Sequence, residues 1–337
     1  MSRQPALSVV MSVLNGRRYL GEAVDSILGQ SFRDFEFIII DDGATDGSGH
    51  LLDVYAQKDP RIRVIHQENR GLTSSLNIGL GFVRGPYVAR MDADDVSEAT
   101  RLARQVEFLD RHADHIAVGT SAHVIDEGGR IVGRINLGGE DRELAVRFLA
   151  DNFMIHGSVM FRGEHNVRYN NALRYAQDFD LWVRLRVLGK IANLSEPLYQ
   201  WRQHSGAISA RKTTEQKRIA RWVADEHLQG LLKQRQYDLV FEGYVRSIGG
   251  AARSVELRNS LAAVTSQDAE MRLRCSHVLA MAECSARRAV ADFSLWLRLL
   301  GIWNASRTLL SILCHRAGRR LFGRRSKEAV ERKDDHS

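Results

Sequence analysis

The chain has 337 residues, of which 44% are hydrophobic and 26% charged, with only 4 prolines. This composition excludes a largely disordered chain, and the length suffices for one large domain with an appended region. The formal net charge is +7. Basic residues gather near the end of the chain, at Arg316, Arg319, Arg320, Arg324, Arg325 and Lys327. On charge alone, such a tail suits a membrane surface or a nucleic acid.

The three cysteines, Cys275, Cys284 and Cys314, share no metal-ligand spacing. An odd count without a CxxC motif favours a reducing compartment over a disulfide framework. The first residues contain one arginine and a short apolar run that ends before Asn15, which indicates a strand rather than a signal peptide. We therefore expect a cytoplasmic protein.

Strands and helices alternate over the first hundred residues. We expect strands at 6–14, 35–40, 61–66 and 87–91, and helices at 19–30, 48–57 and 73–82. Continuous Val and Ile runs are typical of strands that are buried on both faces. Strands separated by helices of about ten residues indicate βαβ units and a parallel sheet.

The pattern changes beyond residue 100. We expect a helix at 100–111, short strands at 116–120, 124–126 and 130–134, a helix at 141–150, a strand at 158–161 and an amphipathic helix at 176–188. After Trp201 the chain is predicted to be almost entirely helical. This division assigns residues 1–210 to an α/β domain and residues 211–337 to a helical C-terminal region.

Acidic residues follow two of the predicted strands. Asp42 comes after strand 35–40, and Asp92, Asp94 and Asp95 come after strand 87–91. In open α/β sheets, ligands bind outside the carboxyl ends of the strands. Carboxylates there suit Mg²⁺ or Mn²⁺, which take one or two of them together with substrate phosphates. The alternative is a solvated turn that caps the next helix, because Asp is favoured at helix N-termini.

Two further interpretations stay open for Asp42 and for Asp178. The carboxylate of Asp42 would accept a nucleobase N–H, or it would close a turn into the helix at Ser48. Asp178 begins a predicted helix, where the positive helix end is expected to keep its carboxylate ionised. That suits a general base for an alcohol, or equally a plain N-terminal charge.

Seven segments resemble glycosyltransferase family 2 in content and order: SVVMSVLNGRRYL, FEFIIIDDGATDGS, NRGLTSSLNIGL, YVARMDADD, HGSVMFR, AQDFDLWVRL and WRQHSGAIS. They cover roughly residues 6–210. The resemblance implies a GT-A fold, an α/β Rossmann-like and mostly parallel sheet flanked by helices. It also implies a nucleoside-diphosphate sugar donor, a divalent metal (Mn²⁺ or Mg²⁺) and inversion at the anomeric carbon.

The resemblance also implies roles by position. Asp178 would be the catalytic base, and Asp94 and His204 would hold the metal. The residues that would bind the donor are Asp42, Asp92, Asp95, Leu14 and Asn15. UDP is the expected nucleotide, but Leu14 stands where relatives usually have an aromatic residue that stacks on the base. Gln177 stands where Glu is common, so the pKa of Asp178 should be less raised than in relatives.

Missing motifs reduce the number of enzyme classes that the sequence allows. The segment WRQH lacks the Q-x-x-R-W pattern of processive synthases, which favours addition of a single hexosyl or N-acetylhexosaminyl unit. The expected acceptor is a hydroxyl of a glycan or lipid-linked molecule in cell-surface polysaccharide synthesis. No GxGxxG or GxxxxGK[ST] loop follows the early strands, which argues against dinucleotide and P-loop enzymes. The remaining alternative is a binding or scaffold protein that has kept the fold and lost turnover.

Residues 293–314 are apolar over about the length of a bilayer span, but Arg298 and Arg307 lie inside the segment. Trp296 and Trp303 fall near one face of the helix, and the basic tail follows. This combination favours a helix that lies on an anionic membrane. The alternative is a core helix packed on the α/β domain. We expect peripheral contact with the inner face of the cell membrane and no nucleic-acid partner.

Overall fold

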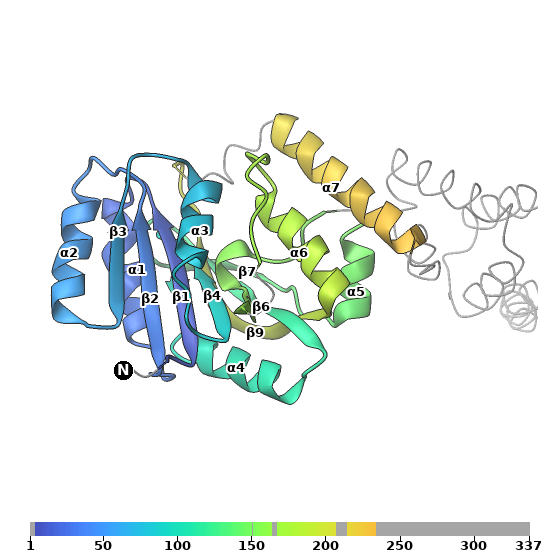
Figure 1. Cartoon of the computed structure of the whole chain (residues 1–337), viewed down its shortest axis with the longest axis horizontal. Coiled ribbons are helices and arrows are strands. Elements are labelled where there is room, and N and C mark those ends of the chain that lie inside the picture. Colours follow the sequence, from blue (N-terminus) through green and yellow to red (C-terminus); the bar gives the residue numbers. More distant parts are fainter. Residues whose placement is uncertain (1–3, 150, 164–166, 207–213, 234–337) are drawn as a thin grey trace, which may run out of the picture. The chain divides into compact units, whose positions relative to one another are not determined.

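The computed structural model describes residues 4–149, 151–163, 167–206 and 214–233 (Figure 1). The expected membrane-surface helix at 293–314 and the basic tail lie outside these ranges. Of the helices in the described ranges, none combines the length and the apolar character needed to cross a bilayer.

The described part of the chain is built on one mixed sheet. Its strands lie in the order β3 (Ile62–His66), β2 (Phe35–Asp41), β1 (Leu7–Val13), β4 (Tyr87–Met91), β8 (Met160–Arg162), β6 (His115–Ile125), β9 (Lys190–Arg202) and β5 (Val96–Ser97), and β7 (Ile131–Ile135) pairs with β6. The first four are parallel to one another. Strand β8 is antiparallel to both β4 and β6, and β9 is parallel to β6. Strands β1, β2, β4, β6 and β9 therefore all end at the same edge of the sheet.

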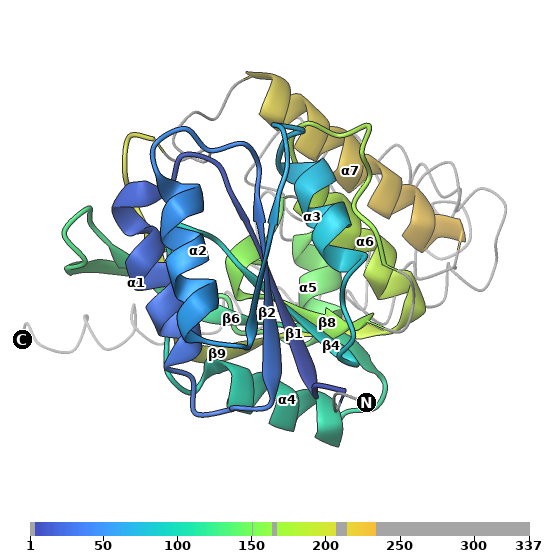
Figure 2. The same cartoon turned by 60° about the vertical axis from the view of Figure 1, so that its left-hand side comes forward.

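Helices cover both faces of this sheet (Figures 1 and 2). Leucines of α2 (Ser48–Lys58) and α4 (Arg101–Arg111) pack into the same core cluster as α1 (Arg17–Leu28). On the other face, α3 (Leu72–Leu80), α5 (Asp141–Arg147), α6 (Gln177–Leu188) and α7 (Thr214–Lys233) supply residues to a second cluster. This arrangement confirms the expected α/β class, with a GT-A type sheet flanked by helices.

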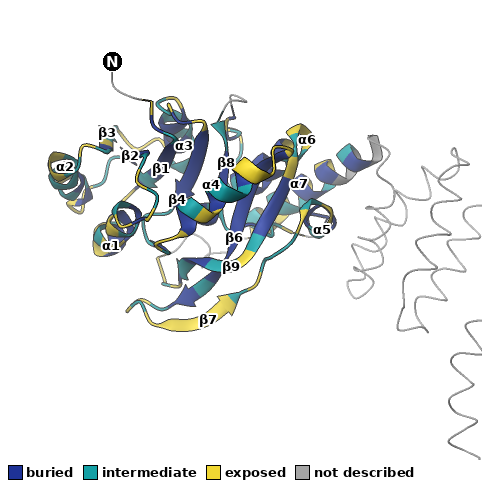
Figure 3. Ribbon diagram, turned by 90° about the horizontal axis from the view of Figure 1, so that it is seen from below, coloured by how far each residue is buried: buried dark blue, intermediate teal, exposed yellow. Residues whose placement is uncertain are grey.

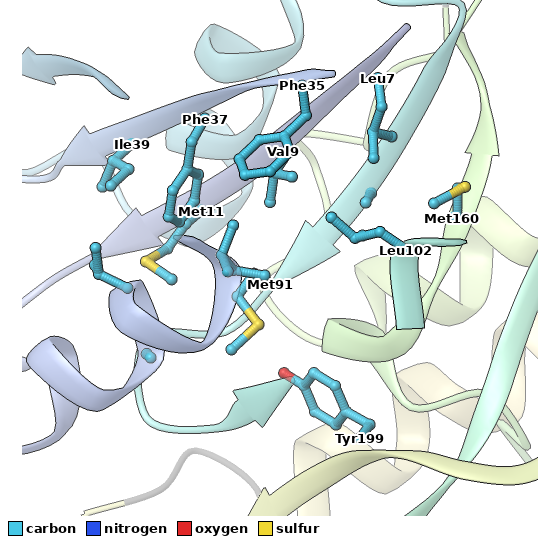
Figure 4. Packing of buried hydrophobic residues seen from close by; sticks show 14 of the residues in the cluster. Leu7, Val9, Met11, Phe35, Phe37, Ile39, Met91, Leu102, Met160 and Tyr199 are labelled. Carbon is cyan, nitrogen blue, oxygen red and sulfur yellow. The ribbon is translucent and has the colours of Figure 1, made fainter. Parts of the chain in front are cut away.

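Side chains alternate between the two clusters along the central strands. Leu7, Val9 and Met11 of β1 pack with Phe37 and Ile39 of β2 (Figure 4). Val10 belongs to the other cluster. Since successive residues of a strand face opposite sides, a strand buried on both faces needs apolar residues at every position. Figure 3 shows these strands as buried, while β7 at the rim is exposed.

Three elements differ from the sequence-based expectations. Strand β6 runs without a break over His115–Ile125, where two shorter strands were expected, and register shifts in its pairing with β9 accommodate its length. The long strand β9 and the short β5 were not expected. Strand β9 contains Pro197 and lacks a regular alternation of buried and exposed residues, so its sequence carries a weak strand signal.

The helix α7 packs on the α/β core rather than standing apart from it. Val223 and Ala224 are buried in the same cluster as Trp182 of α6. A domain boundary at residue 210 stays a prediction.

Candidate active site

The predicted site residues come from elements that end or begin at one edge of the sheet. Asn15, Asp42 and Asp92 follow β1, β2 and β4, which are parallel. His204 follows β9, which runs the same way. Helix α6 precedes β9 by one residue and packs on it, so its amino end, with Asp178, returns to this edge. Segments far apart in the sequence thus meet where α/β enzymes bind their ligands.

Asp42, which follows β2, is hydrogen-bonded to the loop that follows β3. Its carboxylate is 1% exposed and accepts the N–H groups of Arg70 and Gly71 at 2.8 and 2.9 Å, as well as the Gln67 amide at 2.7 Å. Its contact with a nucleotide base stays a prediction.

The loop after β1 is fixed in a similar way. Asn15 adopts φ 53°, a left-handed conformation that Asn tolerates better than most residues. Its Oδ1 accepts the Thr45 N–H at 2.8 Å and so joins this loop to the one after β2. Leu14 is 48% exposed beside it. An exposed apolar side chain at this edge is available to cover a flat ligand.

Asp94 and His204 are brought together across the sheet edge. The Asp94 Oδ2 lies 2.9 Å from the His204 Nε2, and the His204 ring packs on Tyr19 at 5.1 Å between centroids. Neighbouring ligands of an octahedral ion at about 2.1 Å would lie about 3 Å apart. The two atoms lie at hydrogen-bond distance, a spacing that a shared Mg²⁺ or Mn²⁺ ion would also allow, and metal binding by this pair stays a prediction.

Asp92 is paired with a buried arginine. Arg90 is 2% exposed, and its Nη2 donates to the Asp92 Oδ1 at 2.6 Å. Burial lowers the pKa of Arg90, but the neighbouring negative charges, Asp92 first, outweigh burial and raise it overall. The guanidinium therefore stays charged and holds Asp92 at the end of β4.

Asp95 faces the protein interior. Its carboxylate is 3% exposed and accepts the Arg202 N–H at 2.7 Å, while the Arg202 Nε donates to the Asp94 carbonyl at 2.7 Å. Burial, followed by the charges of Asp94 and Asp92, raises the pKa of Asp95 well above its usual range. These bonds tie the acidic loop to β9. A contact between Asp95 and the donor stays a prediction.

Asp178 is the second residue of α6, which begins at Gln177 after Ala176. Ala176 has φ 54°, a left-handed conformation that is uncommon for a residue other than glycine. Burial raises the pKa of Asp178 to about 6, although the amides of the first helical turn lower it. The sequence analysis expected the positive helix end to keep this carboxylate ionised; burial is the larger effect and opposes the helix amides. At neutral pH the carboxyl is mostly ionised and still basic enough to accept a proton.

Several residues of this edge were missed by the sequence analysis. Asn152 donates to Asp178 at 2.8 Å, and His156 and Tyr169 join through Nε2 and Oη at 2.8 Å. Burial lowers the pKa of His156 to about 3, so its ring is neutral at physiological pH. His156 belongs to the family-like segment HGSVMFR, so the sequence could have indicated it. Asn152 and Tyr169 lie outside all seven family-like segments.

A second histidine cluster lies at the opposite end of the sheet. Within the described ranges, His112, Asp114 and His115 alone gather three ligand atoms closely enough for a metal ion. His115 begins β6, at the edge where β4 starts rather than ends. The Lys190 ammonium lies 2.7 Å from Asp114, and this contact holds the pKa of that carboxyl at about 2. This cluster is separate from the acidic loop after β4.

Comparison with known proteins decides the family. A model of glycosyl transferase family 2 matches residues 8–170. An uncharacterized glycosyltransferase of Haemophilus influenzae is 32% identical over 254 residues, which cover 71% of this chain and 78% of that protein. The chain belongs to glycosyltransferase family 2. EpsE of Bacillus subtilis is 35% identical over 226 residues, covering 64% and 79% of the two chains. The hyaluronan synthase of Pasteurella multocida is 28% identical over 222 residues, which are 65% of this chain and 22% of that protein.

Solved structures show the same fold for this glycosyltransferase. Residues 1–349 of S. aureus TarS in complex with UDP align with a TM-score of 0.56 at 18% identity, covering 72% of each chain. The mannosyltransferase PcManGT from Pyrobaculum calidifontis, in complex with GDP-Man and Mn²⁺, aligns with a TM-score of 0.50 at 15% identity, covering 90% and 89%. These likenesses establish the GT-A fold.

Proposed function

We propose that this glycosyltransferase transfers a sugar from a nucleoside-diphosphate donor to a hydroxyl group, with inversion at the anomeric carbon. One observation carries the proposal. A carboxyl group with a pKa of about 6, Asp178, lies at the same sheet edge as the Asp94–His204 pair. A base and a cation site at one edge are what a direct displacement of a diphosphate requires.

Asp94 and His204 would hold the divalent ion, Mn²⁺ or Mg²⁺. A bound ion supplies positive charge that stabilises the departing diphosphate. Asp92, held by Arg90, would bind the ribose or a water on the ion. Asp42, Asn15 and Leu14 would surround the nucleotide base, and Asp95 would bind the donor from the acidic loop that its bond to Arg202 holds in place.

Asp178 would accept the proton of the incoming hydroxyl. The acceptor oxygen then forms its bond to the anomeric carbon while the bond from that carbon to the diphosphate oxygen breaks. The electron pair of the broken bond leaves with the nucleoside diphosphate, and the proton stays on the Asp178 carboxyl. Since bond formation and bond breaking occur on opposite faces of the sugar, a single displacement inverts the anomeric centre and needs no covalent enzyme intermediate.

We propose UDP as the donor nucleotide and a hexose or N-acetylhexosamine as the sugar. The UDP complex of TarS supports UDP, while the GDP-Man complex of PcManGT makes GDP the alternative. The exposed Leu14 covers a base of either kind without stacking an aromatic ring on it. A hyaluronan synthase among the relatives supports a glycan or lipid-linked acceptor in polysaccharide synthesis.

Release of nucleoside diphosphate tests this proposal. The full chain is incubated with Mn²⁺ and UDP-glucose, UDP-N-acetylglucosamine or GDP-mannose, with and without EDTA. Metal-dependent release from one donor is expected, and Asp178→Asn should reduce it roughly 10²–10⁴-fold with donor affinity little changed. A scaffold protein would bind donor and release no diphosphate from any of them.

We also propose that residues 293–327 hold the protein at the inner face of the membrane. The sequence supports this through the two tryptophans and the basic tail. Flotation of the full chain with anionic vesicles, and its partial release by salt, is the expected result. Equal flotation with neutral vesicles would contradict it.

A further inference from the structure

Asn152 is the side chain that lies against the carboxylate of Asp178. It belongs to the segment between α5 and the short helix at His156–Ser158, outside any helix or strand. Its Nδ2 donates to the Asp178 Oδ2 at 2.8 Å. The contact joins this loop to the first turn of α6, 26 residues further along the sequence.

The orientation of the Asn152 amide is fixed by its own loop. Its Oδ1 accepts the Met154 N–H at 3.0 Å, which leaves the NH₂ group to face Asp178. The Asn152 N–H donates to the Asp151 Oδ1 at 2.8 Å, and the Phe153 carbonyl accepts the Asn193 amide of β9 at 2.8 Å. The NH₂ group that donates a hydrogen bond to Asp178 is therefore held in place before any substrate binds.

The surroundings of Asp178 explain why the hydrogen-bond donor beside it is an uncharged amide. Within the described ranges no arginine or lysine forms a salt bridge with it, and Asp92 and Tyr169 are among the titratable groups that act on it. The charge of Asp92 raises the pKa of Asp178, while the Asn152 amide lowers it. A cation in place of Asn152 would stabilise the carboxylate so strongly that it would be a poor base. An amide orients the carboxylate and leaves it basic.

We propose that Asn152 is a positioning residue for the transfer reaction, holding one carboxylate oxygen of Asp178 so that the other meets the acceptor hydroxyl. This inference rests on the proposed role of Asp178 as the base. It assigns a residue that lies outside all seven family-like segments.

Asn152→Ala tests the proposal in the full chain with Mn²⁺ and the donor, among UDP-glucose, UDP-N-acetylglucosamine and GDP-mannose, that wild type turns over fastest. The kcat at pH 7 should fall roughly 10- to 100-fold, as for a lost hydrogen bond to a charged group, with the donor KM nearly unchanged. The acidic limb of the pH–rate profile should move to higher pH, because the pKa of Asp178 rises when its ionised form loses the hydrogen bond from Asn152. Asn170→Ala is the matched control, since the Asn170 Oδ1 accepts the Ala172 N–H instead.

A second arm needs no donor. The pH dependence of unfolding, compared with and without Asp178→Asn, reports the pKa of Asp178 in wild type and in Asn152→Ala. The isosteric Asn152→Asp adds a second carboxyl and should raise the apparent pKa further. An unchanged pKa in both variants, or a fall in kcat with an unmoved pH profile, overturns the proposal. A wild-type chain that turns over no donor contradicts the proposed function, and the pKa comparison still decides whether Asn152 holds the carboxylate.

Discussion

Asp178→Asn should stabilise the folded chain while it removes turnover. The carboxyl has an ordinary pKa of 3.8 in the unfolded chain and about 6 in the folded protein. Below pH 3.8 it is protonated in both states, so it costs nothing. Between pH 3.8 and 6 the unfolded chain releases the proton that the folded chain retains, and stability falls as pH rises. Above pH 6 the whole penalty is present.

The size of the penalty follows from the two pKa values. Each tenfold change in acidity is worth about 1.4 kcal/mol, so the step from 3.8 to about 6 amounts to at most about 3 kcal/mol. The carboxamide introduced by the substitution would carry no charge, and its oxygen would still accept the Asn152 N–H. The variant should therefore be up to about 3 kcal/mol more stable than wild type at pH 8, and equal to it near pH 3.8.

Urea unfolding at a series of pH values measures this difference. Trp182, which is fully buried on the same helix, reports the unfolding of this region by its fluorescence. Glu68→Gln is the control, because it makes the same carboxyl-to-carboxamide change at an exposed position. A stability difference between Asp178→Asn and wild type that is the same at pH 4 and pH 8 would refute the argument. The pKa of Asp178 would then not be raised in the folded protein.

Three further variants probe the surrounding geometry. Asp94→Ala should raise the Mn²⁺ concentration needed for half-maximal turnover by more than the roughly tenfold typical of losing a partner outside the ligand set, whereas equal metal dependence would place the ion elsewhere. In Gly157→Ala the new Cβ would lie 2.7 Å from the Asp92 Oδ2 and collide with the Tyr199 hydroxyl, so donor affinity should fall in titrations with UDP and Mn²⁺. In Gly85→Ala the Cβ would approach the Leu7 backbone to 2.7 Å, which should destabilise the fold by about 1–3 kcal/mol in urea unfolding and leave the donor KM unchanged.

The sequence predicted the central sheet because its physical signal is local. A run such as Phe35–Ile40 is apolar at nearly every position, and only a strand covered on both faces buries all of it. Strand β9 carries no such signal, since Ser195, Glu196 and Pro197 interrupt it. Its pairing with β6 stabilises it instead, and that partner lies far away in the sequence.

The site residues divide in the same way. The acids after β2 and β4 were predictable from strand ends, because parallel strands must deliver them to one edge. The contact of His204 with Asp94 spans 110 residues and was expected only through the family resemblance. How far the pKa of Asp178 is raised could not be predicted, because a helix N-terminus is visible in the sequence and burial is not. Asn152 was missed because it lies in a loop whose sequence has no recognisable motif or periodicity, and its contact with Asp178 depends on the fold.

Two buried arginines and the raised pKa of Asp95 together explain how three acids share one loop. Asp92, Asp94 and Asp95 would repel one another at the end of β4, and each would favour protonation or displacement. The Arg90 guanidinium donates to the Asp92 carboxylate. Arg202 donates its backbone N–H to the Asp95 carboxylate and its side-chain Nε–H to the Asp94 carbonyl. The Asp94 carboxylate is thus the one least engaged by these arginines, and it faces His204. Because the loop is already held in shape, a cation and a diphosphate would meet a preorganised site, and little of their binding energy would be spent on ordering it.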